Sequence, residues 1–139
     1  MTTKQQIIDL WEETVRADRF LHSNGSVRRA PPGARWQLEN ACRRLAAAQA
    51  AARQEFAASR NLEVSTKVGP IDQPEFDHTE LYRRPHEKEP RVIVTHSYAS
   101  KQQLAEYAAL RGYRLDILPW SWHWPATAIA AVFIPRDDT

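Results

Sequence analysis

Apolar residues in the first part of the chain recur at intervals of three and four positions, which is the spacing of one helix face. The series runs from Ile7 to Leu21, and Thr3 with Gln6 has the spacing of a capping box. Gly25 follows, and glycine is the residue type that most often ends a helix. The pattern predicts a helix that begins after Thr3 and ends near Gly25.

A second helical pattern follows a connecting segment, residues 26–35, that contains two prolines and a glycine. Apolar side chains then repeat about every 3.5 residues from Leu38 to Phe56, and alanines occupy much of the remaining helix surface. Because neither apolar stripe is stable in water, the two helices are expected to pack against each other. Residues 1–60 are therefore predicted to form an antiparallel helical hairpin.

Residues 61–139 alternate between strand and helix patterns. Ser100 to Gly112 has a capping box, a helical stripe and a terminating glycine, and this pattern predicts a helix. Apolar and β-branched stretches predict four strands, over residues 61–68, 91–95, 113–118 and 127–134. Residues 69–90 contain four prolines and many charges, so we expect a long irregular stretch there.

The order of these elements predicts an α+β fold or an α/β sandwich. A strand, a helix and a strand in tandem, over residues 91–118, imply a right-handed crossover between parallel strands. The last strand then returns antiparallel. We expect a small mixed sheet of about four strands that contains one βαβ crossover. Residues 61–139 are expected to form one compact domain together with the hairpin of residues 1–60.

The expected crossover brings residues that are distant in the sequence to one edge of the sheet. In parallel strands the carboxyl ends lie at the same edge, where open α/β sheets bind their ligands. The strand over residues 91–95 leads into a polar segment, and the strand over residues 113–118 leads into the sequence WSWHWP. The binding residues predicted at this edge are Tyr98, Ser100, Trp120, Trp122, His123 and Trp124.

Three tryptophans alternate along the WSWHWP segment, so an extended backbone would place Trp120, Trp122 and Trp124 on one side. Such rings cover the core of a domain, bind a protein partner, or stack on a nucleic-acid or small ligand. We expect a small non-enzymatic protein-binding or assembly module that docks through this loop on another protein or on a second copy of itself. Short chains rich in alanine and arginine occur among accessory and structural proteins of phages and mobile elements, which is an association rather than a physical argument.

Two histidines at the same edge, His96 and His123, suggest acid–base catalysis as an alternative, because imidazole exchanges protons near neutral pH. Asp116 precedes the turn and is expected to orient one of the two rings. Ser97 is a candidate nucleophile, although it lacks the G-x-S-x-G pattern of a nucleophile elbow. The helix that starts near Ser100 would direct its free amides towards this edge and favour an anion there. A small hydrolase or transferase is thus an alternative function.

The distribution of charge suggests a further alternative. The 139 residues carry a net charge of +2. The first 60 residues hold ten basic and six acidic side chains, and the remainder hold nine and eleven. Fifteen of the basic residues are arginines, which bind phosphate through a planar fork, so nucleic-acid binding is an alternative function. The arginines proposed for it are Arg28, Arg29, Arg35, Arg43 and Arg44.

Composition excludes several classes of protein. A single cysteine, Cys42, forms neither an internal disulfide nor a cysteine-based zinc site. No apolar run approaches the roughly 20 residues of a membrane span, and the N-terminus lacks the apolar stretch of a signal peptide. We therefore expect a cytoplasmic protein with no cofactor, no metal and no membrane partner. One charged set has the chemistry but not the spacing of metal ligands, and we interpret it as a solvated loop: Asp77, His78, Glu80, His86 and Glu87.

Overall fold

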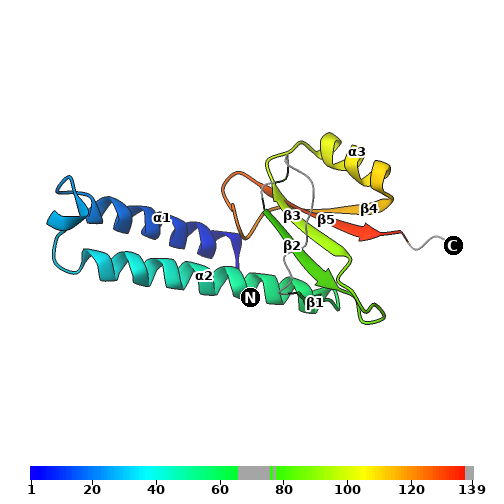
Figure 1. Ribbon diagram of the computed structural model, residues 1–139, viewed down its shortest axis with the longest axis horizontal. Coiled ribbons are helices and arrows are strands. Elements are labelled where there is room, and N and C mark those ends of the chain that lie inside the picture. The colour runs from blue at the N-terminus through cyan, green and yellow to red at the C-terminus, as the bar shows by residue number, and fades with distance from the viewer. Residues whose placement is uncertain (66–75, 77, 137–139) are drawn as a thin grey trace. The chain divides into compact units, whose positions relative to one another are not determined.

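The computed structural model describes residues 1–65, 76 and 78–136 and has an α+β fold. The chain divides into two compact units, Met1–Ala52 and Arg53–Thr139. The first unit contains the predicted helical hairpin, and the second contains a five-stranded sheet with one further helix (Figure 1). None of the helices in the described part of the chain is both long and apolar enough to cross a membrane.

The hairpin of the first unit pairs α1, Lys4–Leu21, with most of α2, Ala34–Ser59. The predicted capping box at the start of α1 is confirmed: Thr3 Oγ1 accepts from the amide of Gln6, and the Gln6 side chain accepts from the amide of Thr3. A short 3-10 helix, η1, Val27–Arg29, lies in the connecting segment.

Apolar and charged contacts join the two helices of this hairpin. The predicted 3.5-residue repeat on α2 is buried at Ala41, Leu45 and Ala52. An ion pair between Glu13 Oε1 and Arg44 NH1, 2.5 Å long, adds a polar contact between the helices. Both ions are exposed enough for water to screen them, so burial of the apolar seam is the main stabilising contribution.

The sheet of the second unit contains five strands in the order β1-β2-β3-β5-β4, and every neighbouring pair is antiparallel. The strands are β1, Glu63–Val64; β2, His78–Arg83; β3, Val92–Ser97; β4, Tyr113–Leu118; and β5, Ile129–Pro135. The helix α3, Lys101–Arg111, connects β3 to β4.

The α+β class, the hairpin and the strand–helix–strand connection are confirmed, but the sheet differs from the prediction in its pairing. The strands β3 and β4 run in the same direction, as predicted, but β5 lies between them and pairs with both. The physical reason is burial: β5 is apolar on both faces and so takes a central position, whereas β4 is partly exposed and takes an edge. The sheet is therefore antiparallel rather than mixed.

The irregular stretch predicted for residues 69–90 is wrong where β2 lies, and β2 supplies the fifth strand. Prolines flank this strand in the sequence but do not interrupt it, so His78 to Tyr82 pair with β3 without a break. The edge strand predicted for residues 61–68 is present as Glu63–Val64, and residues 66–68 lie outside the described part of the chain.

One face of the sheet packs against α3. The row Leu81, Ile93, Phe133 and Leu115 crosses four strands on this face. Ile93 and Phe133 form a buried cluster with other apolar side chains, which are Phe76, Leu104, Ala108 and Ala131. Figure 1 shows α3 lying along this side of the sheet. The core of the second unit is thus closed on this face, and the side chains of Glu80 and His96 lie on the other.

Gly112 ends α3 in the left-handed conformation, with a φ of 76°. A Cβ at this position would meet no atom within 4 Å, so the cost of a side chain there is conformational rather than steric. We predict that Gly112→Ala lowers the free energy of unfolding by about 1 kcal/mol in urea denaturation. Gly112→Asn should lower it less, because asparagine tolerates this conformation. Equal stability of the alanine variant and the wild type would contradict the assignment of this helix end.

Candidate functional site

A nearly buried carboxylate, that of Glu80 on β2, is the centre of a polar cluster in the second unit. Its side chain is 8% exposed. Arg53, in the last two turns of α2, donates from Nε to Oε2 at 2.8 Å. Tyr82 donates its hydroxyl to Oε1 at 2.8 Å, and the indole Nε1 of Trp122 donates to the same oxygen at 3.2 Å. Three donors from three different segments thus converge on one carboxylate.

Three histidines surround the same carboxylate. His96 is fully buried, and its Nε2 lies 3.3 Å from Glu80 Oε1, within ion-pair distance but outside hydrogen-bond geometry. His78 is one-third exposed, and its Nε2 lies 3.4 Å from Glu80 Oε2. The ring of His123 stacks on that of His78, with 3.7 Å between centroids and 7° between planes. Two of the three imidazoles are therefore accessible, and the third is enclosed.

The register of the sheet explains how these side chains meet. His78 lies directly opposite His96, His96 lies opposite Ala130, and Ala130 lies opposite Leu118. These four residues form one row on one face, and β4 ends at Leu118. The loop that carries residues 119–128 therefore leaves the sheet in the row that contains two of the histidines. Glu80 lies on the same face, one row further along.

Ser121 fixes the loop against the sheet. Its Oγ accepts from the amides of His123, at 3.0 Å, and Trp124, at 2.9 Å. The same oxygen lies 2.8 Å from Nδ1 of His96. Because a hydroxyl that accepts twice has its own hydrogen left to donate, Ser121 donates to Nδ1 of His96. Neutral His96 then carries its proton on Nε2, which faces Glu80.

Glu80 remains ionised over the physiological pH range. Burial alone would raise the pKa of this carboxyl, but the contacts from His78, His96 and Arg53 outweigh burial and hold its pKa well below the usual range. Burial and the neighbouring charge of Glu80 raise the pKa of Tyr82, so its hydroxyl stays a hydrogen-bond donor. The centre of the cluster is thus a carboxylate rather than a carboxylic acid.

Two of the histidines are neutral at pH 7. Burial lowers the pKa of His96 and outweighs the attraction of Glu80. Burial, followed by the neighbouring imidazoles of His78 and His96, lowers the pKa of His123 to about 4. A neutral, partly exposed imidazole beside a second imidazole that contacts a carboxylate can accept a proton from a bound molecule. Strongly shifted pKa values of this kind concentrate at functional sites.

The structure brings together some of the residues predicted for the site and separates others. His96, Trp122 and His123 meet as expected. Ser97 lies on the opposite face of β3, where its Oγ accepts from the amide of Ala99, so it is no nucleophile for this cluster. Asp116 orients neither histidine and instead binds Arg60 at 2.5 Å.

The helix start at Ser100 and the neighbouring Tyr98 lie beyond the cluster. The hydroxyl of Ser100 accepts from the amide of Gln103, which confirms the predicted capping box. Tyr98 is 54% exposed, and its ring lies 6.3 Å from that of Trp124. Trp124 in turn packs edge-on against His123. These contacts connect Tyr98 to the histidines through one indole.

The tryptophan loop does not have the extended shape expected from the alternation. Residues 119–127 form bends and turns, so the three indoles do not share one exposed side. Trp122 is 3% exposed and packs on Phe56 as well as binding Glu80. Trp120 and Trp124 are partly buried. The loop thus contributes one of its three rings to the core and holds His123 in place.

Four residues of the cluster were not expected from the sequence: Arg53, His78, Glu80 and Tyr82. The alternation of polar His78, Glu80 and Tyr82 with Thr79 and Leu81 is a strand pattern, and it is the signal that could have identified β2. Arg53 has no local signal, because only the packing of α2 on the sheet brings it to Glu80.

The remaining candidate sites lie elsewhere in the chain. The arginines proposed for nucleic acid are all exposed, and of these Arg44 binds Glu13. His86 and Glu87 follow β2, and the carboxylate of Glu87 forms an ion pair with Arg84. Within the described residues, no group of three or more histidine, cysteine, aspartate or glutamate side chains is arranged to hold a metal ion.

No family model matches this chain, and the searches of curated proteins and of solved structures also return no match.

Proposed function

We propose that the second unit is an acid–base catalyst, a hydrolase or transferase in which His123 and His78 move protons. The observation that carries this proposal is the stacked pair of accessible imidazoles held above a nearly buried carboxylate. The two rings have different surroundings, because only His78 contacts Glu80 directly. Pairs of titratable groups with different surroundings are the usual basis of separate acid and base roles.

In the proposed reaction, His123 is the base and His78 is the acid. Neutral His123 takes a proton from the attacking water or alcohol. At the same time the oxygen of that water or alcohol forms a bond to the carbonyl carbon or the phosphorus of an ester. The bond to the leaving oxygen breaks, and that oxygen receives a proton from His78, whose ring lies beside the carboxylate of Glu80. The cycle closes when His123 loses its proton and His78 regains one, so protons balance.

His96, Ser121 and Trp122 act as positioning residues in this proposal. None of them needs to touch substrate: His96 is enclosed, and the Ser121 hydroxyl is occupied by His96 and two amides. Trp122 is held by Glu80 and is therefore not available as an anchor for a partner. This use of Trp122 favours catalysis over the docking module expected from the sequence. Docking through the other tryptophans stays a prediction.

The experiment is a turnover assay on the purified full chain with p-nitrophenyl acetate and bis(p-nitrophenyl) phosphate. Wild type is compared with the double variant His78→Gln/His123→Gln and with His22→Gln, which removes an exposed histidine of the first unit. We expect turnover of at least one substrate by wild type and His22→Gln, and loss in the double variant. Equal rates in all three proteins, or no turnover of either ester, would contradict the proposal.

A further inference from the structure

A pocket of about 260 Å³ lies on the same face of the sheet as the histidine cluster but towards its other end. Val92 on β3 and Val132 on β5 lie beneath its floor and are almost fully buried, so the apolar surface open to a ligand is that of Leu62 and of Ile134 on β5. Val92 and His96 are four residues apart on one strand, which separates the pocket floor from the histidine row by roughly 13 Å. The pocket is therefore a separate site and needs none of the three histidines.

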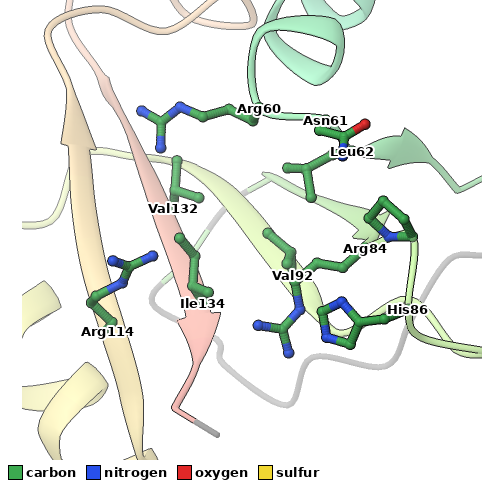
Figure 2. A pocket seen from close by; sticks show the side chains of 10 residues that line it. Arg60, Asn61, Leu62, Arg84, His86, Val92, Arg114, Val132 and Ile134 are labelled. Atoms are coloured by element: carbon green, nitrogen blue, oxygen red, sulfur yellow. The ribbon is translucent and has the colours of Figure 1, made fainter.

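Three arginines surround this apolar floor. Figure 2 shows Arg60 at the end of α2, Arg84 after β2 and Arg114 on β4 around the valine and isoleucine side chains. None of the described residues that line the pocket is acidic. The combination of guanidinium groups at the rim and methyl groups at the floor matches a ligand with one anionic end and one apolar end.

The three guanidinium groups differ in the partners that they already have. Arg60 binds Asp116 at 2.5 Å, and Arg84 binds Glu87 at 2.6 Å. Arg114 is exposed and forms no ion pair with any residue that the structure describes. The unneutralised charge at the rim is thus that of Arg114, and an incoming anion would bind it without displacing an existing ion pair.

We propose that this pocket binds a small organic anion, with a carboxylate or phosphoryl group held by Arg114 and a short apolar body on Leu62 and Ile134. The volume is slightly below the roughly 300–1,000 Å³ of common small-molecule sites, so the ligand is small. Planar guanidinium binds both carboxylate and phosphoryl oxygens through paired N–H groups, and the floor selects ligands with an apolar ring or chain.

The test follows the methyl NMR signals of Leu62 and Ile134 during titration with benzoate and with phenylphosphonate. Two further compounds are titrated as controls: benzyl alcohol, which lacks the charge, and inorganic phosphate, which lacks the apolar body. We expect saturable shifts with at least one of the two aromatic anions and much weaker ones with the two controls. Arg114→Gln should weaken binding of that anion about 10-fold or more, since a hydrogen bond to a charged group is lost.

A matched control is Arg43→Gln, which removes an exposed arginine of the first unit that does not line the pocket. This variant should bind the anion as the wild type does, and so should His123→Gln, which separates the test from that of the proposed catalysis. The proposal is overturned if neither aromatic anion shifts the methyl signals of Leu62 and Ile134. It is also overturned if benzyl alcohol binds as tightly as the anions, or if Arg114→Gln leaves affinity unchanged.

Discussion

Glu80→Ala is expected to lower the free energy of unfolding by about 3–5 kcal/mol, because it removes one partner of a buried ion pair and leaves the other partner behind. Arg53 would lose its carboxylate, and the donors of Tyr82 and Trp122 would lose their common acceptor. Each buried donor left without a partner adds its own desolvation penalty. The measurement is urea denaturation followed by circular dichroism at pH 7.

The matched control for this change is Glu106→Ala, which removes an exposed glutamate of α3 and should alter stability by less than about 0.5 kcal/mol. Glu80→Gln keeps the shape and two of the hydrogen bonds but removes the charge, so we expect a smaller loss than for alanine. If Glu80→Ala lies within about 1 kcal/mol of the wild type, Glu80 does not organise the cluster as described.

His123→Gln alone is expected to lower kcat/KM by about 10²- to 10⁴-fold for the substrate that wild type turns over, which is the usual contribution of a general base. The pKa of His123, lowered to about 4, sets the acid limb of the pH profile. For wild type, kcat/KM should rise about tenfold per pH unit below pH 4, where protonated His123 cannot act as the base. The measurement is an initial-rate profile from pH 2.5 to 8.

His78→Gln provides the comparison for this prediction. It should reduce kcat/KM less than His123→Gln does with these esters, because p-nitrophenolate leaves without needing a proton, and it should retain an acid limb that belongs to His123. The assignment of His123 as the base fails if its removal leaves the acid limb of the profile in place, or if the limb of wild type lies near pH 6.5, where a solvated histidine titrates.

The sequence predicts most elements of this fold because their signals are local. The capping boxes at Thr3 and Ser100 mark two helix starts, and Gly112 marks a helix end. The order of the strands in the sheet, by contrast, has no local signal in the sequence. It depends on which strand is buried on both faces, and the apolar run over residues 127–134 shows that this strand is central without showing which neighbours it takes.

The candidate site could be predicted only in part for the same reason. Residues that follow β3 and β4 were expected together because both strands run in one direction, and that part of the argument survives the insertion of β5. Glu80 was interpreted as part of a solvated loop because prolines flank β2. Its contacts with Arg53 and Trp122 span 27 and 42 positions, and no local pattern reports contacts of that range.

The most direct test of the account is the titration of the histidine rings by NMR between pH 3.5 and 8, with the His123 signals identified from their absence in His123→Gln. The account holds that burial beside two other imidazoles keeps His123 neutral at physiological pH. It predicts a midpoint of about 4 for His123 and no protonation of His96 near pH 6.5. A His123 midpoint of 6.5 or above would contradict it, because that ring would then titrate as a solvated histidine does, and its surroundings would not be what keeps it neutral.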